Sequence, residues 1–296
     1  MRIFLTGGSG FIGSVLVSEL VRRGHTLLLL TRGEPVRVPP ERVEYVEGSL
    51  AQVNTLCATV KEFQPDAAVH LAWEGIPDFS IDMCITNLRS GCDLFSMLAS
   101  AGCKKIIGIG SWWEYGNQSG IMKEDMPSIP ASPIAAIKTA LRVCGTEIAK
   151  KNCITFIWAR PSFVYGPGQK STSLIPSVIS TLQQGIAPVI NNKEASHDFV
   201  YVDDVARALC ALLEKEVFVS GSSTYNIGFG VATNVVDVVK VIYEVMDKKS
   251  LLESVRGNSE CGMYADITKI ATETGWSPLV SLKEGLTRII NQKSII

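Results

Sequence analysis

Residues 2–13 of the chain read RIFLTGGSGFIG, and this stretch decides the fold. An apolar strand leads directly into three glycines spaced Gly7-x-x-Gly10-x-x-Gly13, and an amphipathic helix pattern follows them. Gly7 permits a tight turn, Gly10 lets a pyrophosphate approach the backbone, and Gly13 lets the helix pack against the strand. The N–H groups at the start of such a helix attract phosphate. We therefore predict a dinucleotide-binding loop here, with a purely structural turn as the competing interpretation.

Charge and composition exclude several classes of function. The 296 residues carry a net charge of −1 and contain no basic run, so we expect no nucleic-acid partner. The eight cysteines are scattered without a CxxC pair or a His/Cys cluster, which favours free buried thiols over disulfides or a metal site. No run of about 18 apolar residues occurs, so we expect no membrane partner. Because the first predicted strand begins at residue 2 and leaves no room for a signal peptide, we expect a cytoplasmic protein.

Strand and helix patterns alternate through the first half of the chain. Apolar runs predict strands at residues 3–6, 26–31, 43–46, 67–71, 105–110 and 154–159. Helical spacing covers residues 11–23, 51–63, 81–101 and 133–151. This alternation predicts an α/β fold with a doubly wound parallel (Rossmann) sheet. We expect residues 1–165 to form the dinucleotide-binding domain, with a strand and helix returning to it near 197–215, and residues 166–296 to form mainly a smaller substrate-binding lobe.

Several spaced motifs together resemble the extended short-chain dehydrogenase/reductase family. The resemblance is to its NAD-dependent epimerase/dehydratase branch, which modifies nucleotide sugars. The motifs that carry it are Thr6–Gly13, His70-Leu71-Ala72, Asn87, Ser111-x-x-x-Tyr115-Gly116, Lys138, residues 160–168 (RPSFVYGPG), residues 198–204 (DFVYVDD), residues 225–228 (YNIG), Ala265-Asp266-x-x-Lys269 and Gly275-Trp276. The resemblance implies a nucleotide-sugar substrate, NADP or NAD as cofactor and a homodimer paired through two helices.

The resemblance also implies a set of cofactor-binding residues. It comprises Thr6, Gly7, Gly10, Phe11, Ile12, Gly13, Thr31, Arg32, Ser49, Leu50, Leu71, Ala72, Trp73, Asn87, Lys138 and Pro161. The second predicted strand ends in Thr31-Arg32 without the carboxylate that favours NAD. Because a guanidinium suits a 2′-phosphate, Arg32 favours NADP, with NAD still open. Ser49 stands where the family often has an acidic residue, which puts the usual adenine contact in doubt.

One catalytic residue of the family pattern is missing. The family uses a tyrosine as acid/base, a lysine four residues later on the same helix, and a Ser or Thr at a strand end. Ser111 and Lys138 match, but the tyrosine position is Ile134, which cannot transfer a proton. The proton can come instead from Tyr115, from a desolvated Lys138, or from another group such as Tyr165, Glu114, His197 or a held water. Alternatively, the protein does not perform the family reaction.

The expected substrate side contains further departures from the family. Trp112 and Trp113 replace acidic residues of the dehydratases, so we expect no 4,6-dehydration; they either wall a sugar pocket or pack in the core. Phe163 replaces a frequent asparagine, and His197 a frequent arginine. Arg256 has the spacing of a diphosphate-binding arginine. We group these five residues as candidate substrate contacts.

Two hypotheses follow. The first is an NAD(P)-dependent enzyme that reduces or epimerises a nucleotide-linked sugar with an atypical active site. The second is a protein that binds cofactor and sugar nucleotide without redox turnover, such as a partner subunit in polysaccharide biosynthesis. Retention of Ser111, Lys138 and the glycine loop favours the first, and Ile134 favours the second.

Overall fold

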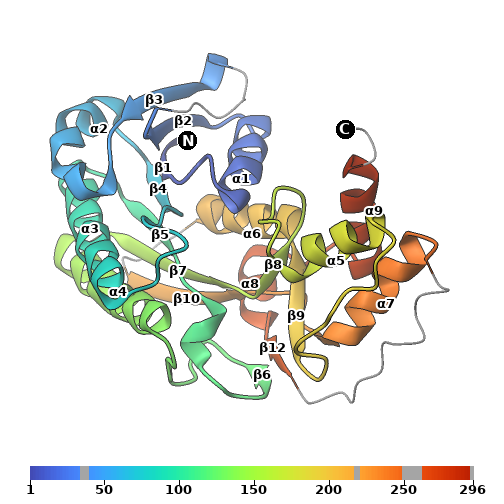
Figure 1. The fold of residues 1–296 in the computed structure, drawn as a ribbon. Helices are drawn as coiled ribbons and strands as arrows, with labels where there is room; N and C mark the ends of the chain where they lie inside the picture. The colour runs from blue at the N-terminus through green and yellow to red at the C-terminus, as the bar shows by residue number, and fades with distance from the viewer. Residues whose placement is uncertain (34–39, 217–220, 249–261, 294–296) are drawn as a thin grey trace.

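A seven-stranded parallel sheet forms the larger part of the structure (Figure 1). The computed structural model describes residues 1–33, 40–216, 221–248 and 262–293. The strand order is β10-β7-β5-β4-β1-β2-β3. The strands are β1 (Arg2–Thr6), β2 (Thr26–Thr31), β3 (Val43–Glu47), β4 (Ala67–His70), β5 (Lys105–Ile109), β7 (Thr155–Pro161) and β10 (Gly221–Ile227). This architecture confirms the predicted doubly wound Rossmann fold.

Helices cover both faces of the sheet because the strands are apolar on both sides. Successive residues of a strand point to opposite faces, so Ile3 and Leu5 join one core cluster and Phe4 joins the other. One face carries α1 (Phe11–Arg22) and α6 (Val202–Glu214), and the other carries α2 (Cys57–Phe63), α3 (Ile81–Ser100) and α4 (Pro133–Asn152). The helix predicted over residues 51–63 is split into a 3₁₀ segment, Leu50–Leu56, and α2.

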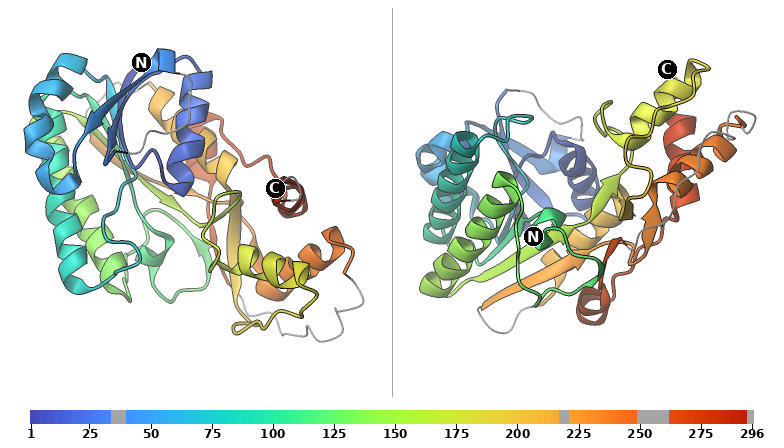
Figure 2. Two further views of the ribbon diagram at one scale, coloured as in Figure 1. Left: turned by 45° about the horizontal axis from the view of Figure 1, so that its top comes forward. Right: turned by 60° about the horizontal axis from the view of Figure 1, so that its bottom comes forward.

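A smaller lobe is built around a second sheet with the order β11-β9-β12-β6, and β8 pairs with β9 outside that path. Its strands are β6 (Gly120–Met122), β8 (Phe163–Tyr165), β9 (Ser196–Tyr201), β11 (Ala232–Asn234) and β12 (Met263–Ala265). Its helices are α5 (Leu174–Gln183), α7 (Val235–Val245) and α9 (Leu282–Lys293), whereas α8 (Thr268–Thr274) packs against β10 and α6 of the large domain. Figure 2 shows α5, α7 and α9 gathered on the side of the molecule opposite α3 and α4.

The strand that returns to the large sheet differs from the expected one. The strand near residue 197 is β9, which lies in the smaller sheet, whereas β10 pairs with β7 at the edge of the large sheet. The sequence signal of β10 is weak because an edge strand tolerates polar residues such as Ser222, Ser223 and Thr224. The helix of this expected unit, α6, does pack against α1 of the large domain.

Within the described ranges, no helix is long and apolar enough to cross a membrane.

Candidate functional site

Two glycines of the loop after β1, Gly7 and Gly13, have no space for a side chain. Gly7 has a φ of +76°, and a Cβ there would lie 2.7 Å from the Ala72 nitrogen. A Cβ on Gly13 would lie 2.0 Å from the Gly7 carbonyl oxygen. Gly10 is the N-cap of α1, and no side chain caps that helix end. The loop therefore presents bare backbone and a free helix N-terminus, which together suit a pyrophosphate.

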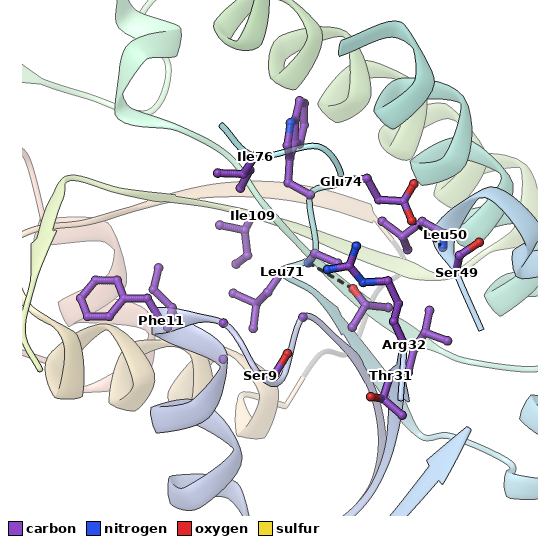
Figure 3. A pocket seen from close by; sticks show the side chains of 18 of the residues that line it. Ser9, Phe11, Thr31, Arg32, Ser49, Leu50, Leu71, Glu74, Ile76 and Ile109 are labelled. Carbon is purple, nitrogen blue, oxygen red and sulfur yellow. Dashed lines mark hydrogen bonds between the residues drawn. The ribbon is translucent and has the colours of Figure 1, made fainter. Parts of the chain in front are cut away.

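A cavity of about 370 Å³ opens beside this loop at the carboxyl ends of β1, β2 and β4 (Figure 3). Its lining comprises Thr6, Gly7, Ser9, Gly10, Phe11, Ile12, Gly13, Leu30, Thr31, Arg32, Gly48, Ser49, Leu50, Leu71, Ala72, Trp73, Glu74, Ile76 and Ile109. We call it the cofactor pocket. It brings together the predicted cofactor residues other than Asn87, Lys138 and Pro161.

Those three residues are buried and are not part of the lining. Asn87 is buried on α3, where its side chain accepts a hydrogen bond from the Glu74 nitrogen (2.8 Å) and donates one to the Glu74 carbonyl (3.1 Å). Pro161 is buried at the end of β7, paired with Ile227 of β10. Lys138 is buried on α4. In this structure, Asn87 and Pro161 support neighbouring backbone rather than line the cavity.

Glu74 is a pocket residue that the sequence motifs did not reveal. Its Oε1 atom accepts a hydrogen bond of 3.1 Å from the backbone nitrogen of Leu50, and Figure 3 shows the two residues side by side. This carboxylate thus lies next to Ser49, where the family's acidic residue is missing. Only the fold could show this, because the loop after β4 and the turn after β3 are distant in sequence.

Thr6 and His70 fix the floor of the pocket. The Oγ1 atom of Thr6 lies 2.8 Å from Nδ1 of His70 and accepts a hydrogen bond of 3.3 Å from the Ala72 nitrogen. Burial and the nearby charge of Lys138 lower the pKa of His70 to about 3. The imidazole is therefore neutral at physiological pH, which fits a structural role for this histidine.

Lys138 lies at one end of the cofactor pocket, beneath Trp73. Its Nζ atom donates a hydrogen bond of 2.7 Å to the Ile109 carbonyl and lies 4.4 Å from the centre of the Trp73 ring. Burial lowers the pKa of Lys138 to about 8, an effect that the charge of Glu114 partly opposes. An ammonium with this pKa can release a proton near neutral pH.

Ser111 follows β5 and caps the 3₁₀ turn Trp112–Tyr115. Its Oγ atom accepts a hydrogen bond of 3.3 Å from the Trp113 nitrogen, and its backbone nitrogen donates one of 2.8 Å to Glu114. The fully buried Glu114 carboxylate also accepts hydrogen bonds from Trp158 Nε1 (2.9 Å) and Arg160 Nε (3.0 Å). Glu114 thus holds Ser111 in position. Both oxygens of its carboxylate already accept hydrogen bonds from protein N–H groups.

Tyr115, the predicted substitute proton donor, is completely buried. Its hydroxyl lies 2.8 Å from Asn226 Oδ1 and 3.1 Å from the Lys123 carbonyl, and burial raises its pKa. Trp112 packs against Tyr115 in a small core cluster with Met122. Neither aromatic residue lines the cofactor pocket. Ile134 lies in the first turn of α4, one turn before Lys138, and that helix contains no tyrosine.

A second cavity of about 440 Å³ lies in the smaller lobe. Phe163 and His197 stack on each other there with their ring centres 3.8 Å apart, and Trp113 meets Phe163 edge-on at 5.6 Å. The lining comprises Phe163, Val164, Tyr165, Gln169, Ser173, Leu174, Ile175, Val189, Ile190, Asn191, Asn192, His197, Phe199 and Val235. We call it the lobe pocket. It contains the predicted substrate residues Phe163 and His197.

One hydrophobic cluster connects the lobe pocket with the cofactor pocket. Phe11 lines the cofactor pocket and also packs against the hydrophobic cluster that contains Tyr165 and Phe199. Burial lowers the pKa of His197, which favours its neutral form. The described lining of the lobe pocket contains no lysine or arginine. Arg256, the predicted diphosphate contact, lies outside the described residues.

Comparison with known proteins gives one family for most of the chain. The sequence model of the NAD-dependent epimerase/dehydratase family matches residues 3–228. The dTDP-4-dehydro-6-deoxyglucose reductase of Escherichia coli is 27% identical to the chain, over 97% of the chain and 96% of the relative.

Two solved structures have the same architecture. MoeE5 in complex with UDP-glucuronic acid and NAD is 26% identical and superposes with a TM-score of 0.83, over 100% of this chain and 99% of the other. DesIV, a dTDP-glucose 4,6-dehydratase from Streptomyces venezuelae solved with NAD and TYD bound, is 25% identical with a TM-score of 0.85, over 100% of this chain and 97% of the other. These similarities confirm the resemblance found in the sequence.

Proposed function

Because the chain belongs to the NAD-dependent epimerase/dehydratase family, we propose that it is an NAD(P)-dependent enzyme that reduces or epimerises a nucleotide-linked sugar. The observation that carries the proposal is that Phe11 of the cofactor pocket packs against the hydrophobic cluster that supplies Tyr165 and Phe199 to the lobe pocket, while Lys138 is buried beside Trp73 of the cofactor pocket. A dinucleotide and a sugar nucleotide need such adjoining sites, since hydride transfer requires their reacting carbons to meet.

The cofactor pocket fits the ADP part of a dinucleotide. The glycine backbone and the N-terminus of α1 would hold the pyrophosphate. Side chains at Gly7 and Gly13 would collide with the backbone of Ala72 and of Gly7, so these glycines allow the loop its shape. Arg32 lies at the end of the pocket formed by β2 and would pair with a 2′-phosphate, which supports NADP. When bound, the dinucleotide would exchange a hydride with the sugar.

We assign the proton transfer to Lys138. Ketone reduction adds a hydride to the carbonyl carbon and a proton to its oxygen, so a donor with a pKa near ambient pH is needed. Lys138 has a pKa of about 8, whereas the Tyr115 hydroxyl is enclosed by Asn226 and the Lys123 carbonyl. Ser111 would orient the reacting oxygen through its hydroxyl, and Glu114 holds Ser111 in position. The neutral amine left on Lys138 would regain its proton from solvent.

The lobe pocket is the proposed nucleotide-sugar site. The stacked rings of Phe163 and His197 offer flat surfaces for a base or a sugar face. Trp113, which is 47% exposed and touches Phe163, would extend this wall towards the sugar. We propose that the substrate's diphosphate is held by backbone N–H groups, neutral polar side chains and Arg256.

A second candidate function, binding without turnover, is favoured by Ile134. No phenol on α4 can take the place of the family's acid/base, so the protein would retain both ligands and lose the reaction. Incubation with NADH or NADPH and a panel of 4-keto and 4-hydroxy nucleotide sugars decides between the two functions. The proposed enzyme converts at least one panel member, and Lys138→Met stops that conversion. Tight cofactor binding with no conversion of any member would establish the binding protein instead.

We further propose a homodimer that pairs α3 and α4 of two copies. Both helices have 20 residues and pack side by side, and they expose the apolar side chains of Ile85 (52%) and Val143 (50%). Light scattering on a size-exclusion column tests this: replacement of both residues by Glu converts the dimer to a monomer, whereas a monomeric wild-type protein would contradict it.

A further inference from the structure

Trp73 separates Lys138 from the cofactor pocket. The Trp73 side chain is part of the pocket lining, but Lys138 is not, although its Nζ lies only 4.4 Å from the centre of the Trp73 ring. The indole therefore covers the ammonium on the side from which a ligand would approach. Ile109, whose carbonyl accepts the hydrogen bond from Lys138, also lines the pocket.

Lys138 has few other partners. Among the described residues, Nζ makes one hydrogen bond, to Ile109, although an ammonium has three donors. The face of the indole attracts the positive charge but accepts no conventional hydrogen bond from it. Hydroxyl groups of a ligand would therefore satisfy Lys138 better than the indole does, and they would need the same space.

Hydrogen bonds fix the backbone next to Trp73, whereas the Trp73 side chain lacks a hydrogen-bond partner. Asn87 holds both the nitrogen and the carbonyl of Glu74, and the Glu74 carboxylate is bonded to Leu50. The indole Nε1 of Trp73 is buried and has no hydrogen-bond partner among the described residues. A buried N–H without an acceptor carries a desolvation cost. A rotation of the Trp73 side chain can relieve that cost without breaking the Glu74 contacts.

We propose that Trp73 is a specificity-determining residue of the cofactor pocket. Its indole leaves the site for the ADP half of a dinucleotide open and occupies the place beside Lys138 that the nicotinamide riboside half would take. With the indole in its present position, the pocket can bind ADP. The ribose hydroxyls of the nicotinamide riboside half reach Lys138 only after the indole has moved away from the ammonium group. This proposal rests on the proposed function, because it assumes that the pocket binds a dinucleotide. It predicts that the indole competes with the nicotinamide riboside half of NAD for Lys138.

Calorimetric titration of ADP and of NAD into wild type, Trp73→Ala and Trp73→Phe tests the proposal. Trp73→Ala should bind NAD at least tenfold more tightly than wild type, while its affinity for ADP stays within about twofold. Trp73→Phe keeps an aromatic face over Lys138 and should behave like wild type. The double variant Trp73→Ala/Lys138→Met should not show this gain in NAD affinity, because the Lys138 ammonium that would bind the ribose hydroxyls of NAD is absent.

Two different results are decisive: one would contradict only the Trp73 proposal, and the other would also contradict the proposed function. If Trp73→Ala binds ADP normally but NAD equally or more weakly than wild type, the indole supports the nicotinamide half and the Trp73 proposal is wrong. If folded wild-type protein binds neither ADP nor NAD, the pocket is not a dinucleotide site, and the proposed function is wrong as well. A cooperative urea unfolding transition like that of the wild type shows that each variant is folded.

Discussion

The Glu114 carboxylate accepts a hydrogen bond of 3.0 Å from Nε of Arg160, and both side chains are almost completely buried. Trp158 Nε1 and the Ser111 nitrogen donate to the same carboxylate. This buried ion pair ties the end of β5 to the end of β7. It thereby fixes the position of Ser111 at the proposed reaction site.

Removal of one member of this pair should destabilise the protein strongly. Glu114→Ala leaves the Arg160 charge buried without its partner, so we expect a loss of about 3–5 kcal/mol in the free energy of unfolding. Urea denaturation measures the change, with Glu19→Ala as a control because Glu19 forms its ion pairs on the surface of α1. A loss below about 1 kcal/mol for Glu114→Ala would show that the pair is not important for stability.

Gly13→Ala should weaken ADP binding strongly. The added Cβ would lie 2.0 Å from the Gly7 carbonyl oxygen, so α1 must shift away from the glycine loop. We expect at least a hundredfold weaker affinity, measured by calorimetry, because the loop no longer presents its backbone to the pyrophosphate. Gly221→Ala is the matched control, since a Cβ there meets nothing within 4 Å. Unchanged ADP affinity in Gly13→Ala would contradict the pyrophosphate assignment.

Lys138 should make stability depend on pH in the alkaline range. Its pKa falls from 10.5 to about 8 on folding, so the unfolded state binds more protons between these values. The free energy of unfolding therefore rises with pH in this window. Below about pH 8, Lys138 is protonated in both the folded and the unfolded state and makes no pH-dependent contribution. Relative to Lys138→Met, the wild type should gain about 3 kcal/mol between pH 7.5 and 10.5. Denaturant curves that keep a constant difference between the two proteins across this window would contradict the low pKa.

The sequence predicted the sheet and the glycine loop because both have local signals. Apolar runs mark β1 to β5 and β7 directly, and the spacing of Gly7, Gly10 and Gly13 reflects contacts within one turn. β10 was missed because an edge strand need not be apolar on both faces. The place of β9 in the smaller sheet depends on pairing with β11 and β12, which no local pattern specifies.

The site was predicted in part for the same reason. The pocket residues on β1, α1 and β4 follow from motifs, but Glu74 and the shielding of Lys138 by Trp73 depend on how distant loops meet. Tyr115 and Trp112 turn inward because Glu114 ties their 3₁₀ turn to Trp158 and Arg160 of β7. Sequence spacing could not show which way that turn faces.

The central claim is that the protein transfers hydride to a nucleotide-linked sugar with isoleucine at position 134. The most direct measurement uses NADH and NADPH labelled with deuterium at the reactive carbon of the nicotinamide. Each is incubated with the protein and 4-keto nucleotide sugars, and the sugar products are examined by mass spectrometry and NMR. The account predicts deuterium on the sugar carbon in the wild type and none with Lys138→Met. Absence of label from every sugar, with cofactor binding intact, would contradict the claim.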